Sequence, residues 1–161
     1  MAILPWWEEP PLVRLANKEE EAIFIFETDP TFILIILYNE AGVYMSQTKH
    51  PNKPMYLKYQ VSCGKVERGE TSLKAAQRET QEKTNLRIPI KAFHYIGNDL
   101  VFNCDMYTVK LYEDEVPELT EPHNMTVWMY YPWNTWYKMA EENRTTPSLT
   151  TYRDLIWDQT Q

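Results

Sequence analysis

The sequence is poor in cysteine, with only Cys63 and Cys104 among 161 residues. Two thiols cannot form the several cross-links of a disulfide scaffold, and neither has partner ligands at the spacing of a zinc site. The sequence therefore disfavours a disulfide-stabilised secreted domain and a zinc-binding module. We expect both cysteines to act as small filler residues.

Long hydrophobic runs are also absent. The longest run, residues 32–38, is far too short to cross a bilayer and is typical of a buried strand. The first residues lack a basic segment followed by an apolar core, so they do not resemble a secretory signal. These features predict a cytoplasmic protein without a membrane partner, and they leave a nuclear location open.

Blocks of basic residues are missing as well. The chain has 16 Lys and Arg against 23 Asp and Glu, which gives a formal net charge of -7. Proteins bind duplex nucleic acid chiefly through Lys and Arg that neutralise phosphates, so this function is disfavoured. An acidic protein can still bind a small polyphosphate if a divalent metal ion supplies positive charge.

The chain length suits one globular domain, which we place at residues 21–161. Residues 1–20 read as an N-terminal extension, because Pro10 and Pro11 interrupt any helix there. We expect Trp6 and Trp7 in this extension to pack on the domain or on a partner, and a homodimer is left open.

Hydrophobic periodicity predicts a mixed sheet with helices on both sides, an α/β fold. One helix is expected at 71–84, where Leu73, Ala76, Thr80 and Thr84 share a stripe that should face the core. The remaining expected elements are strands at 22–26, 32–38, 43–45, 56–61, 88–96, 100–103, 107–112 and 127–131, and helices at 134–142 and 147–157.

The segment from Gly64 to Leu86 carries the clearest functional pattern. Glu70 follows Gly64 by six positions, and Arg78 and Glu79 begin eight positions later on the predicted helix. This segment resembles the Nudix box, G-x5-E-x7-R-E-U-x-E-E-x-G-U, in which U is an aliphatic residue. Six residues fall on the pattern: Gly64, Glu70, Arg78, Glu79, Glu82 and Leu86.

The resemblance implies a Nudix α/β/α sandwich and the hydrolysis of a diphosphate linkage in a nucleoside triphosphate or nucleoside diphosphate derivative. It implies that Glu79 and Glu82 bind Mg²⁺ or Mn²⁺ and activate water, and that the loop at Gly64 supplies a carbonyl ligand. Hard oxygen ligands suit these ions, and divalent metals neutralise charge in phosphoryl transfer. It further implies that Glu70 and Arg78 form a structural ion pair.

Three box positions depart from the pattern, namely Thr80, Lys83 and Asn85. Lys83 matters most, because the family usually has a metal-binding glutamate there. We expect the Lys83 ammonium to pair with Glu79, one helical turn away, and to lower metal affinity. The alternative function is therefore a catalytically impaired Nudix-fold module that binds a nucleotide or RNA, with Lys83 contacting a phosphate directly.

Residues 121–133 resemble the C-terminal part of the small nucleotide-hydrolysing Nudix branch. That resemblance implies a further metal ligand at Glu121, with Asp114, Glu115 and Glu118 as rivals. Trp128 and Trp133 are candidates for contact with a base, although large aromatic residues near strand ends belong to the core more often.

Overall fold

The computed structural model describes residues 13–15, 29–53 and 55–161. The expected strand at 22–26 and the Trp6-Trp7 segment lie outside these residues, as does the predicted domain boundary. The described strands are β1 (Val13–Leu15), β2 (Phe32–Tyr38), β3 (Gly42–Gln47), β4 (Tyr59–Gln60), β5 (Ser62–Lys65), β6 (His94–Asp99), β7 (Cys104–Lys110) and β8 (Met129–Pro132). The helices are α2 (Ser72–Thr84), α3 (Trp133–Glu141), α4 (Pro147–Thr151) and α5 (Arg153–Thr160), with a short 3-10 helix, η1 (Ile90–Ala92).

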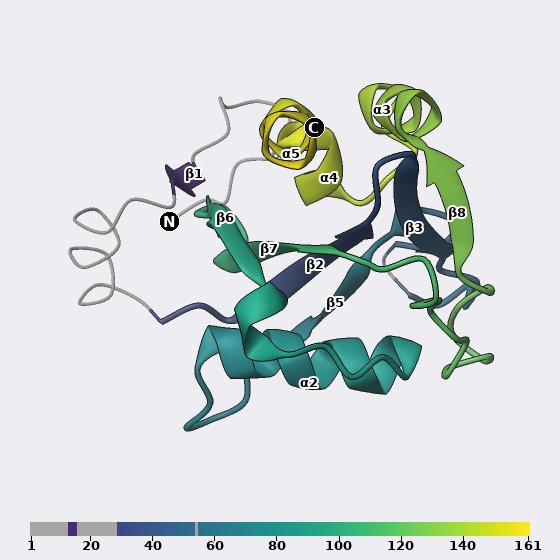
Figure 1. Cartoon of the computed structure of the whole chain (residues 1–161). Helices are drawn as coiled ribbons and strands as arrows, with labels where there is room; N and C mark the ends of the chain where they lie inside the picture. The colour runs from purple at the N-terminus through teal and green to yellow at the C-terminus, as the bar shows by residue number, and fades with distance from the viewer. Residues whose placement is uncertain (1–12, 16–28, 54) are drawn as a thin grey trace.

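These strands form one mixed sheet in the order β1-β6-β7-β2-β3-β4, with β5 also paired to β2 and β8 to β3. β2 and β7 run parallel along their whole length, and the other pairings are antiparallel. α2 covers one side of the sheet and α3, α4 and α5 cover the other (Figure 1). The predicted α/β sandwich is therefore confirmed.

β2 separates two hydrophobic cores, because successive strand side chains point to opposite faces. Ile33 and Ile35 pack toward α2, in the cluster that contains Ala75 and Ala76. Leu34 and Ile36 pack on the opposite side with the large aromatic side chains of α3. This double burial explains why residues 32–38 read as a continuous apolar run.

α2 forms where the sequence predicts a helix, and both of its ends are capped. The Thr71 hydroxyl accepts a hydrogen bond from the Lys74 amide, and Asn85 adopts a left-handed conformation with φ of 62°. Ala76, Thr80 and Thr84 of the predicted stripe are buried, and Leu73 is half-buried. The buried face places α2 against β2 and β5.

Four predicted elements differ in the structure. The predicted strand 56–61 is reduced to β4, because residues 55–57 form a turn in which Leu57 has φ of 64°. Residues 88–96 begin with η1 and form a strand only from His94. Residues 100–103 form a turn instead of a strand, and the predicted helix 147–157 is divided at Tyr152 into α4 and α5.

Candidate functional site

The site begins where the edge of β5 meets α2. Gly64 lies so close to the Glu79 side chain that a Cβ built on the glycine would be 2.1 Å from the Glu79 carboxyl carbon. A real Cβ cannot approach another atom so closely. Only glycine therefore lets α2 bring this carboxylate against the backbone of β5.

Arg78 organises the carboxylates around the start of the helix. Its guanidinium donates to Glu70 through Nε at 2.8 Å and Nη2 at 3.0 Å, and Nη2 also donates to the Lys65 carbonyl at 2.9 Å. Nη1 donates to Glu79 at 2.9 Å and to Glu82 at 3.1 Å. The hydrogen bonds from Arg78 lower the pKa of Glu70, and the carboxylates of Glu70 and Glu79 raise the pKa of Arg78.

Arg78 and Glu70 form a two-point ion pair, and the resemblance to the Nudix box implies a structural pair at these positions. It ties the loop before α2 to the helix and the end of β5. Arg78 also engages Glu79 and Glu82, which the sequence assigns to a metal ion. That additional engagement is a feature that box spacing did not predict.

Glu79 is the most deeply buried carboxylate of the box, with 7 % of its surface exposed. Arg78 binds its Oε1, whereas its Oε2 is buried without a hydrogen-bond partner in this structure. Burial raises the pKa of Glu79, and the hydrogen bond and charge of Arg78 oppose that rise. Glu82 is exposed on the helix surface beyond it.

Lys83 does not form the predicted ion pair with Glu79. Its Nζ lies 2.5 Å from Glu121 Oε2, and Arg78 is the partner of Glu79 instead. Burial disfavours the charged ammonium, but the hydrogen bond and charge of Glu121 raise the pKa of Lys83, with smaller contributions from Cys63 and Glu79. Lys83 therefore remains a cation between the loop and the helix.

The loop that carries Glu121 is fixed by contacts with β3 and α2. The Lys49 amide donates to the Asn124 carbonyl at 3.0 Å, and the Gln47 amide donates to the Thr126 hydroxyl at 2.8 Å. At the other side, the Trp128 indole donates to the Lys83 carbonyl at 3.1 Å. These contacts hold Glu121 at the C-terminal turn of α2.

Two of the three rival carboxylates of this loop have other partners. Glu115 accepts from the Tyr112 amide at 2.8 Å, and Glu118 accepts from the Asn85 side chain at 2.8 Å. Glu121 is the candidate for the further metal ligand that contacts Lys83. Its assignment as a metal ligand stays a prediction.

Trp128 and Trp133 are both buried, each with 6 % of its surface exposed. Trp133 packs edge-to-face against Trp136 and Trp157, and its indole donates to the Asn39 carbonyl. These positions favour the core role of the two tryptophans over stacking on a base.

The described side chains do not fit a divalent ion held jointly by Glu79, Glu82 and Glu121. Arg78 binds the first two carboxylates, and Lys83 binds the third. Within residues 13–15, 29–53 and 55–161, no three or more His, Cys, Asp or Glu side chains form a group that could hold a metal ion. Glu79 Oε2 takes part in neither ion pair and has no hydrogen-bond partner among the described residues.

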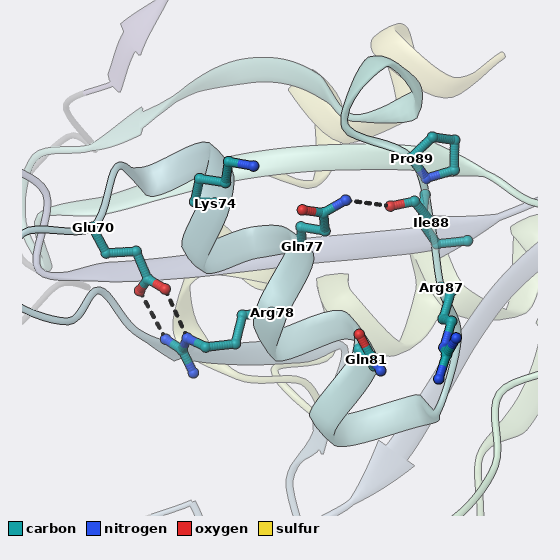
Figure 2. Close-up of a pocket in the computed structure, with 8 residues that line it drawn as sticks. All are labelled: Glu70, Lys74, Gln77, Arg78, Gln81, Arg87, Ile88 and Pro89. Carbon is teal, nitrogen blue, oxygen red and sulfur yellow. Dashed lines mark hydrogen bonds and ion pairs between the residues drawn. The ribbon is translucent and has the colours of Figure 1, made fainter.

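A separate pocket of about 690 Å³ lies on the exposed side of α2. Figure 2 shows Glu70 facing Arg78 at one end and Arg87, Ile88 and Pro89 at the other. The Gln77 side chain donates to the Ile88 carbonyl across its floor at 3.0 Å. This pocket is not lined by Gly64, Glu79 or Lys83. The sequence pattern did not predict it, because it forms where the segment after α2 folds back beside the helix.

A family model for the NUDIX domain matches residues 27–146. No curated protein matches the chain. In the described part of the chain, no helix has the length and apolarity needed to cross a membrane.

Solved structures share the fold at low sequence identity. An Ap4A hydrolase from C. elegans, crystallised as a binary complex, is 18% identical with a TM-score of 0.52, covering 70% of this chain and 86% of that one. A MutT NUDIX hydrolase from Burkholderia pseudomallei is 14% identical with a TM-score of 0.53, covering 68% and 87%. A Deinococcus radiodurans protein is 18% identical with a TM-score of 0.56, covering 86% and 94%.

Proposed function

Because this chain belongs to the Nudix family, we propose that it binds the phosphates of a small nucleotide on the surface between β5 and the C-terminal half of α2. The ligand class is a nucleoside triphosphate or a nucleoside diphosphate derivative. The observation that carries this proposal is Lys83, a half-buried ammonium within the box that the Glu121 carboxylate keeps charged. A phosphate oxygen is a suitable acceptor for its remaining N–H groups.

The residues do not fit a shared metal ion, so the proposed binding depends on the protein's own cation. Lys83 retains a quarter of its side-chain surface exposed, and Glu121 beside it retains a third. The ammonium is thus accessible to a ligand while its position is fixed by the ion pair. The Trp128 contact with the Lys83 carbonyl holds the same helical turn in place.

A direct test is nucleotide binding, measured by calorimetry in EDTA and again with Mg²⁺. We expect binding to persist in EDTA and to weaken by about tenfold or more in Lys83→Ala, because a hydrogen bond to a charged group contributes about 1.5–3 kcal/mol. Lys74→Ala removes a lysine from the exposed side of the same helix and serves as the matched control. Binding that requires metal, or that is unchanged in Lys83→Ala, would contradict the proposal.

Hydrolysis is the second candidate, and Glu79 is the observation that favours it. Its buried, unpartnered oxygen and raised pKa suit an acceptor for a proton from water. This candidate is cleavage of the diphosphate linkage with Mg²⁺ or Mn²⁺, and it requires the ion to displace Arg78 or Lys83 from the carboxylates that they bind. Phosphate and pyrophosphate release from a panel of nucleotides should then require added metal and disappear in Glu79→Gln, and turnover that survives this substitution would reject it.

A further inference from the structure

The surroundings of the Lys83 ammonium are acidic and partly shielded from water. Glu121 contacts it directly, and Glu79 and Cys63 are the other groups whose charge acts on it. Burial raises the pKa of the Cys63 thiol, so this sulfur is expected to be neutral near pH 7. The carboxylates of Glu79 and Glu121 therefore supply the negative charge that Lys83 compensates.

Two elements converge on this ammonium from different parts of the chain. α2 contributes Glu79 and Lys83 one turn apart on the same side of the helix. The loop before β8 contributes Glu121, and Trp128 fastens that loop to the Lys83 backbone. A helix and an anchored loop thus both present carboxylates near one half-buried ammonium.

Glu79 provides an independent observation at the same place. More than nine-tenths of its surface is buried, and its Oε2 has no hydrogen-bond partner. Such an oxygen costs free energy unless a donor or a cation approaches it. Arg78 satisfies only the other oxygen.

From this arrangement we propose that Lys83 is a built-in substitute for a divalent cation, and that replacing it with glutamate converts the site into one that binds Mn²⁺ or Mg²⁺. This inference rests on the proposed function and deepens it, because it states why nucleotide binding needs no metal. A glutamate at position 83 would bring a third carboxylate beside Glu79 and Glu121. Oxygen ligands of this kind suit hard divalent ions.

The experiment measures Mn²⁺ binding to the whole chain without nucleotide, using the loss of the free-ion electron paramagnetic resonance signal. We expect no saturable binding by the wild-type chain at micromolar Mn²⁺, and an affinity at least about tenfold higher in Lys83→Glu. Lys74→Glu is the matched control, because it makes the same charge change on the exposed side of α2. Adding Glu121→Gln to Lys83→Glu should remove the gain.

Lys83→Gln protects the test against a folding failure, because it removes the ammonium without adding a charge. It should gain weaker Mn²⁺ binding that also depends on Glu121. Tight Mn²⁺ binding by the wild-type chain, an equal gain in Lys74→Glu, or no gain in both position-83 variants would overturn the proposal. Since nucleotide is absent, failure of nucleotide binding would reject the proposed function without altering this measurement.

Discussion

At the scale of single residues, the close approach of Gly64 to Glu79 controls the geometry of the site. The carboxylate occupies the volume that a side chain at position 64 would need. Arg78 holds the same carboxylate from the other side. Glu79 thus has little room to move, and a change at either neighbour is transmitted to it.

The first prediction concerns Gly64→Ala. The added methyl group must displace the Glu79 carboxylate or the β5 backbone, and such overpacking typically costs about 1–3 kcal/mol of unfolding free energy. Urea denaturation should show this loss. Adding Glu79→Ala makes room for the methyl group, so the double variant should lose less than the sum of the two single variants. Additive losses would show that the two residues do not compete for space.

The second prediction concerns the pH dependence of stability at Glu79. Its pKa is raised by burial above the ordinary value of 4.5, so the folded chain binds this proton more tightly than the unfolded chain. The resulting stabilisation is complete below pH 4.5 and is lost as the pH rises through the raised pKa. Relative to Glu79→Gln, which has no such proton, the wild-type chain should therefore lose unfolding free energy as pH rises from 4 to 7. If the unfolding free energy of the wild-type chain instead rose with pH relative to that of Glu79→Gln, the raised pKa of Glu79 would be contradicted.

At the scale of elements, α2 carries the charged box residues Arg78, Glu79, Glu82 and Lys83, so its ends set the position of the site. Thr71 caps the first turn, and Asn85 ends the helix in a left-handed conformation. The same helix is attached to β5 through Arg78 and to the β8 loop through Trp128. Weakening a cap should therefore destabilise the helix without removing any side chain from the site.

The third prediction is that Thr71→Ala lowers the unfolding free energy by about 1 kcal/mol, because the Lys74 amide loses its acceptor. Chemical denaturation measures this change. Gln81→Ala, at an exposed position of the same helix, should leave stability nearly unchanged. Equal losses in the two variants would mean that the cap contributes nothing specific.

The elements also show how far the sequence can predict this fold. α2 was predictable because its caps and its apolar stripe are local signals. The turn at residues 100–103 was not, because Asp99 accepts hydrogen bonds from the Val101 and Phe102 amides and draws the apolar chain out of the strand. Asp99 also accepts from Ser148 and Tyr152, which links the end of β6 to the break between α4 and α5.

In the candidate site, too, the local contacts were predictable and the contacts between distant segments were not. The Glu70–Arg78 contact lies within one short segment, and the resemblance to the Nudix box implied a pair between these two residues. The Lys83–Glu121 pair joins a helix to a loop whose position depends on β3 and Trp128. Helical periodicity favoured Glu79 as the partner of Lys83. It did not indicate that Glu79 pairs with Arg78 instead.

At the scale of the whole molecule, the sheet joins two cores that neither side can form alone. Ile35 contributes to the core beneath α2, and the adjacent Leu34 contributes to the core beneath α3, α4 and α5. Because both cores share β2, we expect them to unfold together. The fluorescence of Trp133 and Trp136 reports on the core beneath α3, α4 and α5, to which both residues belong.

The fourth prediction is that Leu34→Ala and Ile35→Ala each lower the unfolding free energy by about 2–5 kcal/mol, as is usual when a buried aliphatic side chain is truncated. Far-UV circular dichroism and tryptophan fluorescence should give coincident transitions in both variants. Val127→Ala, at a half-exposed position, is the control. Separate transitions in the two probes would show that the cores unfold independently.

The ion pair between Lys83 and Glu121 also has a genetic consequence. Lysine and glutamate codons differ by a single base at their first position, so one point mutation separates an internal cation from a third carboxylate at this turn of α2. Neither the contact of Gly64 with Glu79 nor the hydrogen bond from Trp128 to the Lys83 carbonyl uses the Lys83 side chain. Under the proposal that Lys83 substitutes for a divalent ion, one mutational step in either direction would exchange a bound metal ion for a charge encoded in the chain.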